Sequence, residues 1–173
     1  VITASEEIGC EGARFLANSK LLDRAGAIVV AEPTANYPYV GHKGLVWFEI
    51  ETTGVTAHGS MPEVGDNAIN RMARVIGDLE HFHFPVESHP VMGSPTLNVG
   101  TIRGGLNTNS VPDSARITVD MRTVPGIDHV HLCHSLERLL APRGASVRKI
   151  VDTPSLYTPP DDEWVQQVFE ACT

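Results

Sequence analysis

The sequence predicts an α+β protein built around one β-α-β-β-α-β unit, the ferredoxin-like arrangement of a four-stranded antiparallel sheet with both helices on one face. Two observations predict it. Two of the four expected strands alternate apolar and polar residues as half-buried strands do, and two longer segments repeat apolar residues at helical spacing. A continuous apolar run near the N-terminus is instead typical of a strand buried on both faces. A strand-helix-strand remnant of an α/β domain is therefore expected before the unit.

Residues 1–39 are expected to form that remnant. A short β-branched strand at 1–4 precedes a helix over 11–22, and Ala27–Ala31 is the continuous apolar run. The chain opens without Met inside an apolar strand and closes inside an amphipathic helix. We therefore expect an internal fragment of a longer protein. The alternative is that residues at the two ends were simply not observed.

The first half of the β-α-β-β-α-β unit contains three strands and one helix. Apolar and polar side chains alternate over 45–53, which predicts the first strand. A helix of about five turns follows, with Asp66 or Asn67 able to cap its start. The next two strands are expected at 96–102 and 114–123, and apolar and polar side chains alternate along the second of them.

The second half of the unit adds a helix and a strand. The helix is expected over 128–142, where leucines recur on one face, and Gly144 ends it. The last strand is expected at 146–151. We therefore place one inserted domain at 40–153, and interpret 154–173 as a Pro-rich linker and a helix start that leads back to the larger domain.

Composition excludes several classes of function. The 173 residues include 13 Lys and Arg against 21 Asp and Glu, a formal charge of −8, whereas duplex-binding proteins usually carry a basic stripe. No apolar run approaches the ~20 residues of a membrane helix. The three cysteines are odd in number and far apart, which favours a reducing compartment. We therefore expect a cytoplasmic protein with neither nucleic acid nor membrane as a partner.

Carboxylates follow both predicted N-terminal strands. Glu6 and Glu7 come directly after the first strand and Glu32 ends the second, where open α/β sheets place ligands. One carboxylate could bind a metal while another accepts a proton from metal-bound water, if the chain bends as Gly9 permits. Acidic residues in a first helical turn, a salt bridge or a loop cap are the alternatives. Three carboxylates are too few for a two-metal site.

Two loops of the inserted domain could also carry chemistry. His58 lies among small residues and could donate a hydrogen bond to an oxyanion, although an ordinary loop histidine is the alternative. Asn109 presents an amide that could bind a carboxylate or a carbonyl, unless its loop is a structural hairpin. The cluster His129-x-His131-x-x-His134 looks like a metal site, but only its last two members share a helix face, and we assign it no metal role.

An ordered set of short motifs extends over nearly the whole chain. They are Ala4-Ser5-Glu6-Glu7-Ile8-Gly9, Ala31-Glu32-Pro33-Thr34, Gly41-His42-Lys43-Gly44, Ala57-His58-Gly59-Ser60, Gly104-Gly105 with Asn109-x-Val111-Pro112, and Asp120-Met121-Arg122. In this order and spacing they resemble the co-catalytic di-zinc amidohydrolases. That family includes acetylornithine deacetylase, succinyl-diaminopimelate desuccinylase, aminoacylase and carboxypeptidase G.

The resemblance implies a catalytic zinc domain at 1–39. Glu6 resembles the general base of the family, Glu7 a ligand of one zinc and Glu32 a ligand of the other. The family's remaining ligands, two histidines and a bridging aspartate, would lie outside this chain. The fragment by itself is therefore expected to be inactive, with its metal site absent or incomplete.

The resemblance also implies that 40–153 is the lid and dimerisation domain. His58 resembles the lid histidine that reaches into the partner subunit's active site, so a homodimer through this domain is expected. Asn109 and Arg122 resemble substrate-binding positions. Lys43 stands where some members have a substrate-binding arginine.

The activity that the resemblance implies is hydrolysis of an amide bond. Two zinc ions, with cobalt as an alternative, would activate water for attack on an N-acyl amino acid, as in deacetylases and desuccinylases of amino-acid biosynthesis. The run from Asp120 to Gly126 is somewhat closer to the acetylornithine deacetylase branch.

Two other functions compete with this interpretation. The chain could be a non-catalytic dimerisation module, or come from a member that has lost its metals. It could also be a ferredoxin-like regulatory domain that binds amino acids. The second alternative would leave Glu6, Glu7 and Glu32 without a purpose.

Overall fold

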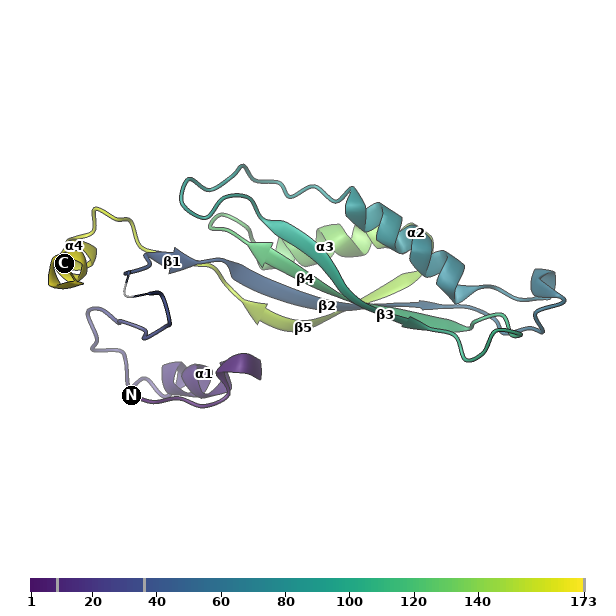
Figure 1. Ribbon diagram of the computed structural model, residues 1–173, viewed down its shortest axis with the longest axis horizontal. Helices are drawn as coiled ribbons and strands as arrows, with labels where there is room; N and C mark the ends of the chain where they lie inside the picture. Colours follow the sequence, from purple (N-terminus) through teal and green to yellow (C-terminus); the bar gives the residue numbers. More distant parts are fainter. Residues whose placement is uncertain (9, 36, 173) are drawn as a thin grey trace. The chain divides into compact units, whose positions relative to one another are not determined.

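Two units make up the fold in the computed structural model, which describes residues 1–8, 10–35 and 37–172 (Figure 1). One unit is Lys43–Ser155, and the other combines Val1–His42 with Leu156–Thr173. Each is described by itself below.

The larger unit contains the predicted antiparallel sheet. Its strands are β2 (Gly44–Thr53), β3 (Thr96–Gly104), β4 (Ser114–Thr123) and β5 (Ala145–Thr153), in the spatial order β3-β4-β2-β5. All three pairings are antiparallel. The four predicted strands are therefore confirmed, each with ends within two residues of the expected positions.

Two helices cover one face of this sheet, as predicted (Figure 1). Helix α2 (Ala68–Glu80) begins at Asn67, whose side chain accepts a hydrogen bond from the Asn70 N–H at 3.0 Å. Helix α3 (His129–Leu140) begins at Asp128 in the same way and continues as a 3-10 turn, Ala141–Arg143. Gly144 ends it with a φ of +63°.

Helix α2 is shorter than the five turns expected from its periodicity. It ends at Glu80, after 13 residues, because the chain then turns and packs two aromatic rings against the core. Phe82 and Phe84 meet edge to face with ring centroids 5.1 Å apart. Phe82 and Phe84 therefore belong to a loop that covers the core.

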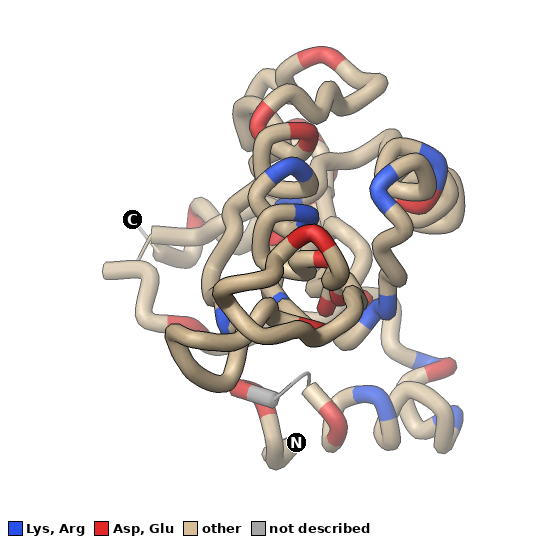
Figure 2. The backbone as a smooth tube through the Cα atoms, turned by 90° about the vertical axis from the view of Figure 1, so that its right-hand side faces the viewer, with Lys and Arg blue, Asp and Glu red and all other residues tan. Residues whose placement is uncertain are grey.

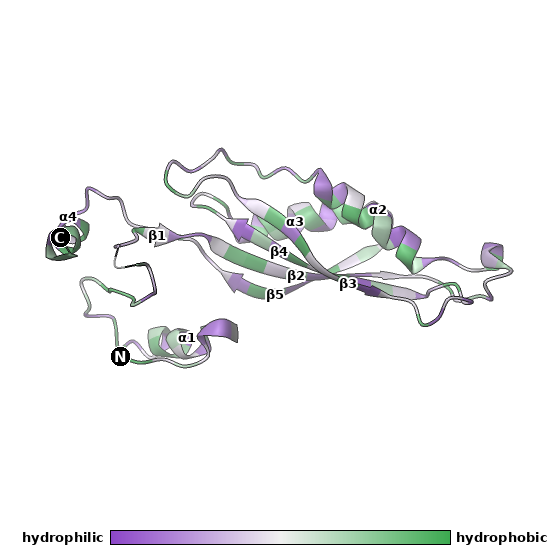
Figure 3. Cartoon of the chain, viewed as in Figure 1, coloured by the Kyte–Doolittle hydropathy of each residue, from purple (hydrophilic) through white to green (hydrophobic). Residues whose placement is uncertain are grey.

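The core lies between the sheet and the two helices. In Figure 3, hydrophobic and hydrophilic bands alternate along β2 and α2. The side chains that are almost fully buried there come from β2, α2, β4 and α3: Val46, Phe48, Ile50, Met72, Val75, Leu79, Ile117, Val119, Met121, Leu136 and Leu140. Burial of this set is the main term that stabilises the unit.

The smaller unit differs from the predicted strand-helix-strand pattern. Helix α1 (Glu11–Asn18) forms after a 3-10 turn at Glu6–Ile8 (η1), but none of the described residues of 1–4 or 27–31 is in a strand. A strand persists only when a neighbour pairs with its backbone groups, and no described segment pairs with these two. Their assignment to a catalytic domain stays a prediction.

The predicted linker also contains structure. A short strand β6 (Leu156–Tyr157) pairs with β1 (Gly41–His42), and α4 (Glu163–Cys172) follows it. Asp162 accepts hydrogen bonds from the first backbone N–H groups of α4, including that of Trp164 at 2.9 Å.

Charges of both signs are interspersed along the described backbone (Figure 2). Among the described residues, no helix is both long and apolar enough to cross a bilayer.

Candidate functional site

The predicted site residues of the larger unit fall at opposite ends of its sheet. Arg122 pairs in register with Leu45, near the start of β2, and Lys43 directly precedes this strand. His58 forms an isolated bridge with Ser110, beyond the other end of the β2–β4 ladder (Figure 1). Because β2 has ten residues and a strand rises about 3.3 Å per residue, about 30 Å separates the two ends.

We call the end of the sheet at Lys43 and Arg122 the near end and the end at His58 the far end. At the far end, two loops about 50 residues apart in sequence hold His58 and Asn109 together. The Gly59 N–H donates to the Asn109 carbonyl at 2.7 Å, and the Val111 N–H donates to the Ala57 carbonyl at 2.8 Å. A Cβ at Gly59 would lie 3.0 Å from the Asn109 oxygen, so glycine allows this close approach. The structure therefore brings two predicted site residues to one place.

Local hydrogen bonds set the tautomer of the exposed His58 ring. The Ser60 backbone N–H, which can only donate, points at Nδ1 from 3.2 Å, and the Ser60 hydroxyl lies 2.8 Å from the same nitrogen. Nδ1 is thus an acceptor, and the neutral ring carries its proton on Nε2. The Nε2–H group is a donor, which is the property that oxyanion stabilisation requires.

At the near end, both predicted substrate-binding cations contact oxygen atoms. Lys43 Nζ donates to the Ser94 carbonyl at 2.5 Å, from the loop that precedes β3. Arg122 is half-buried and forms an ion pair with Asp120, which lies two residues earlier on the same strand. Within one chain, Arg122 and Lys43 therefore lie far from His58 and Asn109, at the opposite end of the sheet.

The three predicted carboxylates belong to the smaller unit and are exposed. Glu6 and Glu7 open the turn η1, and Glu32 lies in an irregular segment. The bend expected at Gly9 concerns a residue outside those described, but Ser5 already has a φ of +63°. Positive φ is uncommon for serine and often marks functional segments, and it sets the direction of Glu6. Among the described residues, no three His, Cys, Asp or Glu side chains gather to hold a metal.

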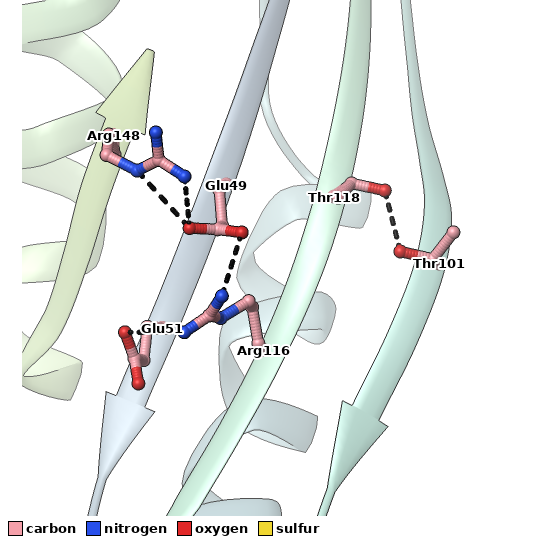
Figure 4. Close-up of polar contacts among 6 residues, drawn as sticks. All are labelled: Glu49, Glu51, Thr101, Arg116, Thr118 and Arg148. Carbon is pink, nitrogen blue, oxygen red and sulfur yellow. Dashed lines mark hydrogen bonds and ion pairs between the residues drawn. The ribbon is translucent and has the colours of Figure 1, made fainter. Parts of the chain in front are cut away.

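The face of the sheet opposite the helices carries an ion-pair cluster that the sequence analysis missed (Figure 4). Glu49 on β2 accepts from Arg148 on β5 at 2.7 Å and from Arg116 on β4 at 3.1 Å, and the Thr101 and Thr118 hydroxyls lie 2.7 Å apart. The hydrogen bond from Arg148 is the largest cause that holds the pKa of Glu49 below its ordinary value. The polar residues that alternate with apolar ones along β2 and β4 indicated a polar face. They did not indicate which side chains form ion pairs across the strands.

A second network, buried at the near end of the sheet, was also missed. The Thr123 hydroxyl, which is fully buried, lies 2.9 Å from His129 Nε2, and His129 Nδ1 lies 2.6 Å from Asp152 Oδ1. Lys149 binds the other oxygen of Asp152 at 2.5 Å. Burial raises the pKa of Asp152, but hydrogen bonds from Lys149 and His129 outweigh burial and hold this pKa below its ordinary value. His131, by contrast, is exposed and pairs with Asp128.

Comparison with known proteins places the larger unit in a characterised group. Residues 40–148, more than half of the chain, match the sequence family described as the peptidase dimerisation domain of M20 peptidases. An acetylornithine deacetylase from Myxococcus xanthus is 36% identical over 131 residues, which cover 73% of this chain and 34% of that protein. A probable succinyl-diaminopimelate desuccinylase from Staphylococcus epidermidis is 29% identical, with coverage of 91% and 45%.

A solved structure also resembles the fold of this chain. A tripeptidase from Staphylococcus aureus superposes with a TM-score of 0.72 at 27% identity, over 98% of this chain and 45% of that one. The chain thus spans less than half the length of the proteins that it resembles.

Proposed function

Because the chain belongs to the M20 peptidase dimerisation-domain family, we propose that it is part of a metal-dependent hydrolase that cleaves the amide bond of N-acyl amino acids. The relatives named acetylornithine deacetylase and succinyl-diaminopimelate desuccinylase support this substrate class. We place the whole protein in the cytoplasm, as a homodimer whose small-molecule substrate needs no membrane or nucleic acid.

The carboxylates of the smaller unit supply only part of a metal site. Glu7 and Glu32 are suitable oxygen donors, but the described residues assemble no cluster around them, and zinc sites usually include nitrogen or sulfur donors. We therefore propose that Glu7 and Glu32 each contribute to one of two zinc sites, which other parts of the whole protein complete. Zinc would there lower the pKa of a bound water. Without those parts, the chain is a dimerisation module with no activity of its own.

Glu6 is the proposed general base. Its carboxylate lies next to Glu7 in η1 and is exposed, so it could take a proton from the attacking water and later deliver it to the leaving amine. Ser5, directly before Glu6, has a left-handed backbone conformation. This turn of the chain supports a role for Glu6 different from that of Glu7.

The observation that carries the proposal is the separation of the two ends of the sheet. His58 offers an Nε2–H donor next to Asn109, about 30 Å from Arg122 and Lys43 by the length of β2. One active site cannot use all four residues from one chain. In a homodimer, an isologous interface with the two subunits antiparallel would bring the far end of one subunit to the near end of the other. We propose that His58 and Asn109 act in the partner's site, with His58 stabilising the oxyanion and Arg122 and Lys43 binding substrate within their own chain.

Complementation between two inactive variants of the whole protein tests this arrangement. Glu6→Gln and His58→Ala, mixed under conditions of subunit exchange, should recover about a quarter of wild-type turnover of Nα-acetyl-L-ornithine, because one site of each heterodimer keeps both groups. Each variant alone should lose a factor of about 10² or more.

Two controls accompany the mixture. Glu6→Gln mixed with Glu7→Ala should recover nothing, since both changes fall in the same half of the site. Absence of recovery with His58→Ala despite demonstrated exchange would contradict action in the partner's site. Near-normal turnover by Glu6→Gln would contradict its role as base.

A further inference from the structure

The contact between Arg122 and Asp120 is side-on. Arg122 Nε and Nη2 both donate to Asp120 Oδ2, at 3.1 and 3.0 Å, and Oδ1 lies 2.9 Å from Nε. The two residues are two positions apart on β4, so both project from the face of the sheet that the helices leave open. The pair thus needs no other element to form.

The carboxylate is the inner member of this pair. Asp120 lies directly opposite Trp47 in the β2–β4 register, and its Oδ1 atom is buried. Apart from the ion-pair contact with Arg122 Nε, this atom has no hydrogen-bond donor among the described residues. The side chain of Asp120 is 29% exposed and that of Arg122 is 42% exposed. The Trp47 Nε1–H is also buried without an acceptor among the described residues. Asp120 is thus the more buried member of the pair, and Arg122 is the more exposed one.

The side-on contact leaves one edge of the guanidinium open. Arginine has five N–H donors in a fixed plane, and Asp120 uses the Nε edge. The two Nη groups at the tip remain able to form the parallel pair of hydrogen bonds that a carboxylate accepts. An N-acyl amino acid keeps a free α-carboxylate of this geometry.

From this geometry we propose that Asp120 is a positioning residue for substrate binding. It holds Arg122 in one orientation, so that the tip of the guanidinium meets the α-carboxylate of the N-acyl amino acid. The inference rests on the proposed function, which assigns Arg122 to substrate binding. An arginine without this partner would have to order several rotatable bonds on binding, and substrate affinity would fall.

Kinetics of the whole protein test the proposal. With Nα-acetyl-L-ornithine as the probe, Asp120→Asn and Asp120→Ala should raise KM about tenfold and change kcat by less than about twofold. The ratio of kcat/KM for this probe to that for its carboxamide should fall about tenfold as well, because the carboxamide cannot use the arginine fork. A merely structural defect would affect both compounds equally.

Glu49→Gln is the matched control. It neutralises another carboxylate on the same open face, paired with Arg148 and Arg116, and it should change neither KM nor the carboxylate-to-carboxamide ratio. Asp120→Asn keeps the side-chain volume, so it guards against a folding defect in Asp120→Ala. In an Arg122→Ala background, Asp120→Asn should have no further effect on KM.

The outcomes separate the two proposals. The discrimination is the preference for the carboxylate probe over its carboxamide, measured by the ratio of the two kcat/KM values. If Arg122→Ala abolishes this discrimination but both Asp120 variants keep it, Asp120 does not position Arg122 and the further inference is wrong. A fall in kcat with unchanged KM would overturn it too. If Arg122→Ala leaves KM and the discrimination intact, the proposed role of Arg122 is wrong, and the inference falls with it.

Discussion

Replacement of His129 by alanine should destabilise the larger unit by about 2 kcal/mol. His129 lies between a fully buried hydroxyl, that of Thr123, and the half-buried carboxylate of Asp152. A buried polar group that loses its partner costs about 1–3 kcal/mol. The lost contact with Asp152 contributes less to the destabilisation, because the Asp152 side chain is 32% exposed and keeps its contact with Lys149.

His131→Ala provides a close control. His131 lies in the same first turn of α3 and contacts its carboxylate partner, Asp128, at 2.7 Å, much as His129 contacts Asp152 at 2.6 Å. Its side chain is 84% exposed, whereas that of His129 is 12% exposed. Both replacements are His to Ala in the same turn and change helix propensity alike. The difference between their losses of unfolding free energy therefore reports the effect of burial. We expect less than about 0.5 kcal/mol for His131→Ala.

Urea unfolding followed by tryptophan fluorescence measures both variants. The chain has two tryptophans, so a Trp164→Phe background leaves Trp47, on β2, as the reporter of the sheet. Equal losses of unfolding free energy for the two variants, or a loss below about 0.5 kcal/mol for His129→Ala, would refute the reasoning from burial.

Acid should weaken the same network. Because the pKa of Asp152 is lowered in the folded state, its ionisation contributes stability that is present above the unfolded-state pKa of about 4 and is lost as pH falls below it. Asp152→Asn should therefore lower the free energy of unfolding at pH 7 and flatten its dependence on pH below 4.

Two further predictions concern backbone packing and metal binding. Gly44→Ala should destabilise the sheet by about 1–3 kcal/mol in urea unfolding, because the new Cβ would lie 2.5 Å from the Ser155 backbone nitrogen. Gly77→Ala in α2, where the Cβ meets nothing within 4 Å, should instead stabilise the protein by up to about 1 kcal/mol, and a similar effect of both would contradict the packing argument. Zinc titration of this 173-residue chain in a calorimeter should show no tight site, because no three ligand side chains gather among the described residues. Micromolar stoichiometric binding that survives Glu7→Ala would show that the ligands are misplaced.

The elements of the larger unit could be predicted because their signals are local. Alternation marked the strands at 45–53 and 114–123, and Asn67 and Asp128 marked the helix starts, since a cap is read from residues within one turn. The length of α2 could not be predicted in this way. Phe82 and Phe84 follow the end of the helix, and their rings pack against the core from a loop.

The smaller unit shows the limit of such reasoning. The apolar run Ala27–Ala31 has the composition of a buried strand, but the structure forms none there. A strand depends on the partner that accepts its hydrogen bonds, and composition does not supply that partner. The predicted metal and base roles of Glu6, Glu7 and Glu32 therefore stay predictions.

By itself, the sequence determined the order and type of the elements in the larger unit and the residue types that could carry chemistry. Only the tertiary structure decided which of those residues meet. His58 and Asn109 share one end of the sheet while Arg122 lies at the other, and Glu49 binds an arginine 99 residues away. The physical reason is that periodicity and capping act within a few residues, whereas strand order and register bring together residues that no local pattern connects.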